Sequence, residues 1–436
     1  MYKFKILQHF YTSYIKKTLY SGYLGYNYSM KNIDVAIIGA GASGMVTAIL
    51  LAREGFRVLL VEKQKAGGKK ILASGNGRCN ISNIKISKSN FHGANRVLID
   101  TLLKEYNLND IKKFFKSIGQ DLIETDSNRL FPASMQASSV LELLNAEIKR
   151  LNIEVIYEAK DTVIEKNLSI AIDKKIYKAK NLVISTGSPA APQLGGNNSG
   201  IEIASTFKHT TIEPLPALVS LYSNSPICKK AAGVKIDINL KLFVDNQETT
   251  SKSGDLLFTK YGISGLSVLD ISIDITKAIR ANKNYHLEID FFPNLNKKEL
   301  LEFLKSRIDK KRELPLNLWL SAILNSKISD HLLKELNLID KTEKQLNNSN
   351  LKLLVEKVKR YKIEIDKLRE FKYAEVASGG VNSNEVDISM QSKKVKNLYF
   401  TGEVLDIVGD RGGYNFTFAW FSAFRAANSI ISKGLH

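Results

Sequence analysis

Short apolar runs alternate with amphipathic stretches of helix length along the first third of the chain. The run Ile33–Ile38 breaks at Gly39-x-Gly41-x-x-Gly44 and resumes with a helical pattern over Met45–Glu54. A second apolar run begins at Arg57 and ends at Glu62. This order of strand, glycine turn, helix and strand predicts a βαβ unit that holds a dinucleotide.

Each glycine of the triplet has a separate function in such a unit. Gly39 permits the tight turn, Gly41 lets the backbone approach a pyrophosphate, and Gly44 lets the helix pack on the strand. Glu62 stands where a carboxylate accepts hydrogen bonds from a ribose diol, which disfavours a 2′-phosphate there. A glycine triplet also occurs in ordinary strand-to-helix turns, but the register of both strands, the helix and the acid favours dinucleotide binding.

Two later strands also end in polar or glycine residues. A buried run from Lys180 stops at Thr186-Gly187, and another from Asn397 stops at Gly402-Glu403. Helices are expected over much of 95–151 and over 416–432, with short strands in 153–164 and 168–176. A helix that starts near Gly412-Gly413 directs N–H groups toward the strand ends, where they stabilise negative charge.

The middle of the chain has a different period. Alternation in Lys235–Val244 and His286–Phe292 predicts half-buried antiparallel strands, with the glycine-punctuated segment 254–265 between them. Several helices are expected over 296–360, including 299–308 and 316–324. The cations Lys305, Arg307, Lys310, Lys311 and Arg312 fit a solvated helix face better than a phosphate site.

The segment from Lys63 to Asn83 is a long loop rich in glycine, asparagine and basic residues. Its glycines allow the backbone close to a ligand, and Lys69, Lys70 and Arg78 offer positive charge to a pyrophosphate or substrate. We therefore interpret it as a ligand-binding loop instead of a plain connection.

Composition adds a few limits. The 436 residues are 44% hydrophobic and 25% charged, which is ordinary for a globular protein, and no apolar run is long enough to cross a bilayer. Two cysteines and six scattered histidines suggest neither a disulfide framework nor a metal site, and a cytoplasmic location is expected. The net charge of +19 suits a nucleic-acid partner, although a Lys-rich genome produces the same charge. The residues before Lys31, rich in Tyr and Lys, are expected to be a disordered extension or a mis-assigned start.

Three segments together resemble one known family. Gly67–Asn83 with Gly75-x-Gly77-Arg78-Cys79-Asn80, the segment 254–265, and the stretch from Thr401-Gly402-Glu403 to Tyr414-Asn415 are similar to the BaiN/RdsA-type flavoproteins, the YhiN-like, HI-type oxidoreductases. The resemblance covers nearly everything after Lys31. It implies an α/β fold in which an FAD-binding Rossmann-like domain of the two-dinucleotide-binding type is interrupted by an antiparallel β-barrel domain that carries a small helical domain. The implied boundaries are 1–30 for the extension, 31–210 and 376–436 for the FAD domain, 211–295 and 361–375 for the barrel, and 296–360 for the helices.

The resemblance also implies the residues that contact FAD. We expect Gly39, Gly41, Ala42, Ser43, Gly44, Glu62 and Lys63 near the adenosine diphosphate, Val163, Thr186 and Gly187 beside it, Lys70, Gly75, Gly77, Arg78 and Asn80 toward the flavin, and Gly402, Glu403, Gly413, Tyr414 and Asn415 along the ribityl chain and ring.

Family members are linked to the reduction of carbon–carbon double bonds, in uridine of large-subunit ribosomal RNA or in steroid-like bile-acid intermediates. Both acceptors hold an alkene conjugated to a carbonyl, so hydride delivery needs a proton donor near the flavin. Cys79, with Tyr414 second, is the expected donor; the alternative for Cys79 is a small buried apolar residue. No second glycine triplet and no Cys-x-x-Cys is present, so NAD(P)H is expected to bind transiently over the flavin. An RNA-modifying reductase, a small-molecule enone reductase and a flavin-binding protein without turnover all remain open, as does the oligomeric state.

Overall fold

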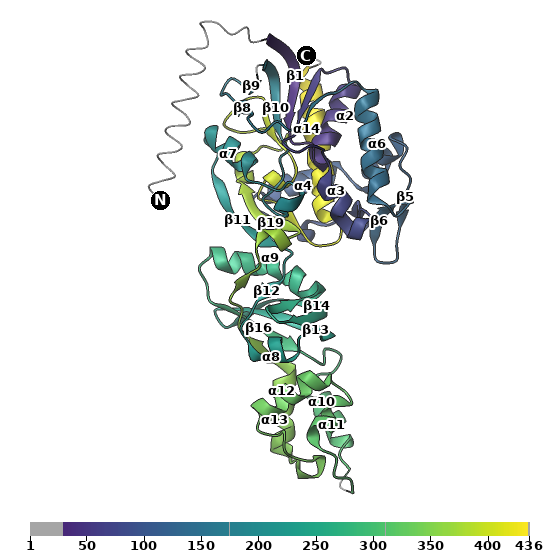
Figure 1. Cartoon of the computed structure of the whole chain (residues 1–436), viewed down its shortest axis with the longest axis vertical. Coiled ribbons are helices and arrows are strands. Elements are labelled where there is room, and N and C mark those ends of the chain that lie inside the picture. Colours follow the sequence, from purple (N-terminus) through teal and green to yellow (C-terminus); the bar gives the residue numbers. More distant parts are fainter. Residues whose placement is uncertain (1–28, 174, 310, 435–436) are drawn as a thin grey trace.

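The computed structural model describes residues 29–173, 175–309 and 311–434. The chain is elongated, with a sheet-and-helix domain, an antiparallel sheet and a group of helices following one another along its long axis (Figure 1). The expected extension lies outside the described residues up to position 28. Ser29 and Met30 already belong to the first strand and pair with Lys175 and Ile176, so the first domain begins before the expected boundary at 31.

The first domain is built on a seven-stranded sheet in the order β7-β2-β1-β10-β9-β8, with β20 also paired to β10. Its parallel strands are β1 (Ser29–Ile38), β2 (Val58–Val61), β7 (Glu154–Ile156), β10 (Lys175–Ile184) and β20 (Leu398–Phe400). The antiparallel strands are β8 (Val163–Ile164) and β9 (Ser169–Ile172). The β-branched and apolar runs of the sequence are buried in this sheet, as parallel strands require.

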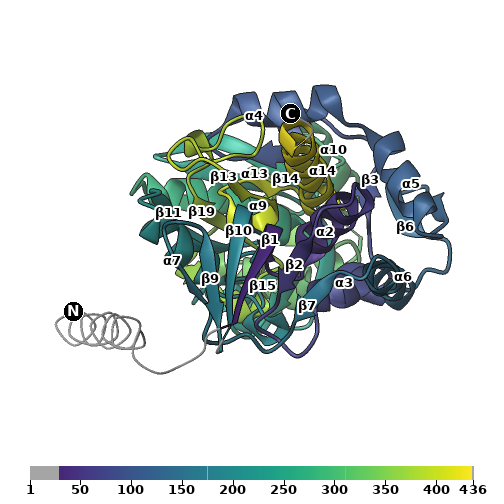
Figure 2. The same cartoon turned by 90° about the horizontal axis from the view of Figure 1, so that it is seen from above.

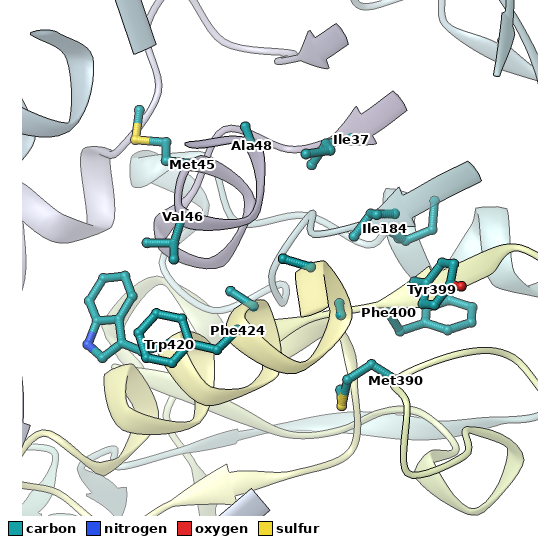
Figure 3. Packing of buried hydrophobic residues seen from close by; sticks show 14 of the residues in the cluster. Ile37, Met45, Val46, Ala48, Ile184, Met390, Tyr399, Phe400, Trp420 and Phe424 are labelled. Atoms are coloured by element: carbon teal, nitrogen blue, oxygen red, sulfur yellow. The ribbon is translucent and has the colours of Figure 1, made fainter. Parts of the chain in front are cut away.

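Two helices pack together in the core of this domain, α2 (Ala42–Arg53) and α14 (Tyr414–Gly434). Figure 3 shows Val46 of α2 facing Trp420 and Phe424 of α14, with Ile37 and Ile184 on the neighbouring strands. Because α2 is buried on nearly every side, its apolar residues show little helical periodicity. Among the described residues, no helix combines the length and apolarity needed to span a membrane.

The remaining elements of this domain surround the sheet and these two helices (Figure 2). The helices are α3 (Lys69–Ala73), α4 (Arg96–Glu105), α5 (Leu108–Ser117), α6 (Ala137–Arg150) and α7 (Ser199–Thr206). The short strands are β3 (Ser82–Asn83), β4 (Phe91–His92), β5 (Leu122–Glu124), β6 (Arg129–Pro132) and β21 (Val408–Gly409). The hairpin β5–β6 interrupts a segment that the sequence predicted to be mostly helical, because β6 also pairs with β3 of the glycine-rich loop.

A two-stranded ladder connects the first domain to the insertion. It is formed by β11 (Thr211–Ala217) and β19 (Val376–Val381). Beyond it lies a second seven-stranded sheet in the order β17-β16-β13-β14-β15-β12-β18. Its elements are β12 (Leu221–Tyr222), β13 (Lys235–Val244), β14 (Gln247–Thr259), β15 (Gly262–Ser264), β16 (Tyr285–Asp290), β17 (Tyr361–Ile363) and β18 (Lys367–Leu368), with helices α8 (Pro226–Lys230) and α9 (Leu266–Arg280).

The second sheet is barrel-like, but no ladder closes it within the described residues. Its edge strands β17 and β18 pair with β16 and β12 and not with each other. Only residues 364–366 separate these strands, so the chain itself joins the two edges. The sheet therefore curls round without the continuous hydrogen bonding of a closed barrel.

The helices α10 (Lys297–Ser306), α11 (Leu316–Ser321), α12 (Ser326–Glu335) and α13 (Asn348–Lys359) follow the second sheet. Asn296 caps α10 through a capping box with Glu299, and Asn347 caps α13. One continuous apolar cluster contains both Leu240 of the sheet and Trp319 of the helices. The helical group thus shares its core with the sheet.

Candidate active site

One large cleft, about 1490 Å³ in volume, follows the carboxyl ends of β1, β2, β10 and β20. Sites for single small molecules occupy roughly 300–1,000 Å³, so this cleft has room for a dinucleotide and a second compound. The position at the carboxyl ends of parallel strands is where open α/β sheets bind ligands.

The glycine turn forms one wall of the cleft. Gly39 adopts a φ of +105°, and a Cβ there would lie only 2.8 Å from the carbonyl carbon of Ser185. The first helical hydrogen bond of α2 runs from Met45 N–H to Gly41 O at 3.0 Å. The N–H groups of Ala42 and Ser43 precede that bond, so they have no acceptor within the helix and suit an anion in the cleft.

Glu62 stands at the end of β2 and lines the cleft. One carboxylate oxygen accepts a hydrogen bond from Ala40 N–H at 2.8 Å, and the other accepts from Gln64 N–H at 2.8 Å. These bonds fix the carboxylate beside the glycine turn. Each oxygen keeps a lone pair that a ribose hydroxyl can use.

The carboxyl ends of β10 and β20 also lie beside the glycine turn. A Cβ on Gly402, which follows β20, would lie 2.6 Å from Ser43 Oγ, so this strand end touches the start of α2. Thr186 follows β10, and its buried hydroxyl has no partner among the described residues. The geometry brings together segments that are more than 200 residues apart in the sequence.

The glycine-rich loop contributes α3 and the turns after it. Lys70 forms an ion pair with Glu403 at 3.0 Å, and Ser188 Oγ donates to the same carboxylate at 3.1 Å. Asn80 is buried, and its side-chain oxygen has no partner in the described part of the chain. The loop is therefore fixed against the β20 end and presents an unused acceptor close to the cleft.

An acid and two arginines, none of them predicted as site residues, meet elsewhere in the cleft. Arg129 of β6 pairs in register with Asn83, whose side chain donates to Gly412 O at 3.1 Å. Arg411 makes a two-point ion pair with Asp270 of α9, at 3.0 and 2.9 Å. Glu375 lies within electrostatic reach of both arginines, and all three side chains line the cleft.

Glu375 has an unusual environment for a carboxyl group. Its side chain is open to the cleft but makes no hydrogen bond or ion pair among the described residues. The surrounding walls remove much of the bulk water that solvates a carboxylate, and this burial raises its pKa; Arg411 opposes the rise and Asp270 adds to it. A carboxyl group that keeps its proton more readily than usual is suited to act as an acid.

Most of the residues expected at a cofactor site line this cleft. They are Gly39, Gly41, Ala42, Ser43, Glu62, Lys63, Lys70, Gly75, Arg78, Asn80, Val163, Thr186, Gly187, Gly402, Glu403, Gly413 and Asn415. Gly44 and Gly77 do not line it: Gly44 packs against Gly39, and Gly77 is exposed with a φ of +79°. The sequence analysis missed Glu375, Arg129 and Arg411 because nothing in their local sequence distinguishes them. The one available signal was the position of Glu375, an isolated acid directly before a buried strand.

The structure places neither expected proton donor in the lining of the cleft. Cys79 is fully buried in the apolar core and does not line the cleft, and burial raises the pKa of its thiol to about 12. Tyr414 is also buried outside the lining, its hydroxyl donates to Lys85 O at 2.9 Å, and burial raises its pKa. Because both side chains are buried outside the lining, the mechanism proposed below uses neither of them.

The basic cluster on the helical group is largely neutralised. Lys305 pairs with Glu302 at 2.9 Å, and Arg312 pairs with Glu343 at 2.6 Å. Arg307 stacks over Trp319 at 5.3 Å and donates to its carbonyl oxygen at 2.8 Å. Only Lys305 lies on a helix, because α10 ends at Ser306, and Lys310 lies outside the described residues. The expected helix face therefore holds for Lys305 alone, and the other described members of the cluster lie in the segment that follows α10.

The residues present fit FAD. The unpaired N–H groups of the α2 turn suit a pyrophosphate, and Glu62 suits a ribose. The unpartnered buried atoms of Thr186 and Asn80 suit further polar groups of such a ligand.

Comparison with known proteins identifies relatives along almost the whole chain. The family description "HI0933-like protein Rossmann domain" matches residues 33–429. The chain is 32% identical to the 3-dehydro-bile acid delta(4,6)-reductase of Clostridium scindens, over 92% of this chain and 99% of that protein. It is 29% identical to the ribosomal RNA dihydrouridine synthase of Escherichia coli, over 92% of this chain and 99% of that one.

A solved structure of 3-ketosteroid-delta4-(5alpha)-dehydrogenase from Rhodococcus jostii RHA1 superposes with a TM-score of 0.47 and 13% identity, covering 94% of this chain and 98% of that one. The match to the family description and the 32% identical relative together show the family of this chain. This protein belongs to the HI0933-like Rossmann-domain family of FAD-dependent oxidoreductases.

Proposed function

We propose that this protein reduces a carbon–carbon double bond conjugated to a carbonyl, with NAD(P)H as the source of electrons. Bound FAD would supply the hydride. The glycine turn of α2, Glu62 and the β20 end would hold it. The observation that carries the proposal is that Glu375, Arg129 and Arg411 line the same cleft and that both arginines lie within electrostatic reach of the acid.

The three charged groups supply what such a reduction needs besides hydride. Negative charge develops on the carbonyl oxygen of the substrate, and the guanidinium groups of Arg129 and Arg411 would stabilise it. Arg411 uses Nε and Nη2 for Asp270, so its Nη1 remains for a substrate. Glu375 would give its proton to the α-carbon and regain one from water in the open cleft. One hydride and one proton are thereby added across the double bond.

We propose uridine of large-subunit ribosomal RNA as the substrate, reduced to dihydrouridine in the cytoplasm. The C5–C6 double bond of uracil is conjugated to the C4 carbonyl, as the chemistry requires. The net charge of +19 and the similarity to a ribosomal RNA dihydrouridine synthase support this choice.

The test is mass-spectrometric mapping of ribosomal RNA from a strain that lacks the gene. We expect one dihydrouridine to disappear from large-subunit RNA and to return with the wild-type gene. Glu375→Gln removes the proton and preserves the shape, so it should lower the rate by roughly 100-fold or more while FAD stays bound. As pH rises through the raised pKa of Glu375, wild-type kcat should fall, and the variant should lose this limb. An unchanged RNA map after deletion would exclude the RNA substrate.

A second candidate is a steroid-like enone, because the bile-acid reductase is also a relative over nearly its full length. In that case purified protein should oxidise NAD(P)H when a steroid enone is added, with no dependence on RNA. Bound flavin that neither NAD(P)H nor any acceptor alters would instead indicate a binding protein without turnover.

A further inference from the structure

Three tyrosines from separate segments surround one arginine at the joint between the first domain and the second sheet. Arg369 lies 3.6 Å from the ring centroid of Tyr373 and 4.1 Å from that of Tyr261. Tyr222 of β12 lies 5.8 Å from the same guanidinium and meets Tyr261 edge to face at 5.7 Å. We call these four residues the tyrosine–arginine cluster.

Two lysines extend the cluster at its edges. Lys367 lies 5.1 Å from the ring of Tyr222, and Lys372 lies 5.8 Å from the ring of Tyr373. Both lysines are exposed, and neither forms an ion pair with any described residue. One carboxylate lies among these groups, since Glu370 accepts a hydrogen bond from the Tyr222 hydroxyl at 3.0 Å. Aromatic rings and cations otherwise make up this part of the surface.

The cluster continues into the cleft. Tyr373 ends the short 3₁₀ helix η5 (Phe371–Tyr373), and both Lys372 and Tyr373 line the cleft together with Glu375. Only Ala374 separates Tyr373 from the proposed proton donor. A group stacked on Tyr373 would therefore lie close to Glu375.

A purely structural role explains only part of this arrangement. The Arg369–Tyr261 contact joins β18 to the turn before β15 and would stabilise the joint by itself. Tyr373, however, keeps 47% of its surface exposed although it covers the guanidinium so closely. Arg369 Nε is buried without a hydrogen-bond partner among the described residues, so the side chain is held by its aromatic neighbours. A ring fixed on one face by a cation and open elsewhere provides a preformed stacking surface.

We propose that the tyrosine–arginine cluster is the binding surface for an unpaired strand of the RNA substrate, with a base next to the reacting uridine stacked on Tyr373 and backbone phosphates against Lys372 and Lys367. This inference rests on the proposed RNA substrate. Bases stack on aromatic side chains without need of a particular sequence, and lysines follow the phosphates. A uridine inside a duplex cannot reach a deep cleft, so the strand must present it unpaired.

The test measures binding of a fluorescein-labelled 12-nucleotide oligouridylate by fluorescence anisotropy, with a 12-base-pair RNA duplex for comparison. Wild-type protein should prefer the single strand. Tyr373→Leu should weaken binding by about fivefold to 150-fold, which is the range for loss of one stacked base, and Tyr373→Phe should retain most of the affinity. Lys372→Gln should reduce the slope of log affinity against log salt concentration by about 0.7, the value for one phosphate contact on a single strand.

Matched controls lie on the helical group. Phe303 is 38% exposed and faces Arg307 at 5.7 Å, so Phe303→Leu removes a comparable exposed ring near an arginine. Lys334→Gln removes an exposed lysine of α12. Both controls should bind the oligouridylate as the wild type does. Equal losses in the controls would mean that the effect is general charge or stability, and would overturn the inference.

The outcomes separate this inference from the proposed function. If the wild-type gene restores dihydrouridine but the Tyr373 and Lys372 variants bind RNA normally, the surface is wrong and the function stands. If the wild type neither binds the oligouridylate nor restores dihydrouridine, the RNA substrate itself is wrong. Lys372 is exposed, so its variant keeps the test decisive even if Tyr373→Leu does not fold.

Discussion

The packing of Gly44 gives the sharpest prediction about the cofactor site. A Cβ on this residue would overlap the carbonyl oxygen of Gly39 and would also lie 3.2 Å from the Cβ of Ser185. In Gly44→Ala, the start of α2 must retreat from β1 by about 1 Å to reach 3.0 Å, the closest approach that Cβ atoms show. Backbone surrounds the site, so no flexible side chain can give way instead.

The retreat has two consequences of different size. Overpacking of this kind costs about 1–3 kcal/mol of folding stability. The N–H groups of Ala42 and Ser43 move with the helix, and a hydrogen bond of ordinary length no longer exists after lengthening by about 1 Å. Loss of two bonds to a pyrophosphate, each worth about 1.5–3 kcal/mol, should weaken FAD binding by roughly 100-fold or more.

Gly41→Ala is the matched comparison. A Cβ on Gly41 would meet only Ser185 O, at 4.0 Å, and its φ of −84° suits any residue. This variant should keep the melting temperature of the wild-type apoprotein and lose FAD affinity only because a methyl group enters the cleft. The melting temperature is followed by circular dichroism, and FAD affinity by quenching of flavin fluorescence. If Gly44→Ala melts and binds FAD like the wild type, the proposed geometry of the turn is wrong.

Two other predictions concern stability. Glu147 holds Arg53 and Arg150 at 2.7 and 2.6 Å, and these partners lower its pKa to about 2, so Glu147→Gln should cost about 2 kcal/mol in urea unfolding at pH 7. Because the folded-state pKa is depressed, this contribution is complete above the ordinary value of 4.5 and should vanish as pH falls toward 2; a difference that persists there would contradict it. Cys79→Ser should reduce stability by about 1–3 kcal/mol because a hydroxyl is more costly than a thiol to bury in the apolar core, while the turnover per folded, FAD-bound molecule stays unchanged. A large loss of turnover would restore Cys79 as a proton donor.

The cofactor side of the cleft was predictable because it is encoded locally. The glycine turn and Glu62 belong to one βαβ unit, and Thr186 and Gly402 each follow directly from a buried strand. Parallel strands bring their carboxyl ends to one edge of a sheet, so residues at these ends meet whatever the length of chain between them. The spacing in the sequence was enough to predict their meeting.

The positions of Arg129 and Arg411 in the cleft were not predictable from the same patterns. Arg129 is placed by the pairing of β6 with β3, and Arg411 is placed by an ion pair with Asp270 of the insertion. Both depend on contacts between distant segments that show no periodic signal. Cys79 shows the opposite case, because it lies within a distinctive loop while its side chain belongs to the apolar core, which the loop pattern does not predict.

The residues that would hold FAD and the charged residues of the same cleft come from different parts of the fold. The joint with the insertion contributes Leu218, Leu266 and Leu269 to the cleft, and Leu266 is 43% exposed there. The insertion also fixes Arg411 through Asp270, so its position influences the charged groups that would face a substrate. The glycine turn and Glu62 belong to the first domain, at the carboxyl ends of β1 and β2. We therefore expect substitutions at the joint to change the accepted substrate while FAD affinity is preserved, and a bile-acid reductase and a ribosomal RNA dihydrouridine synthase both occur among the relatives.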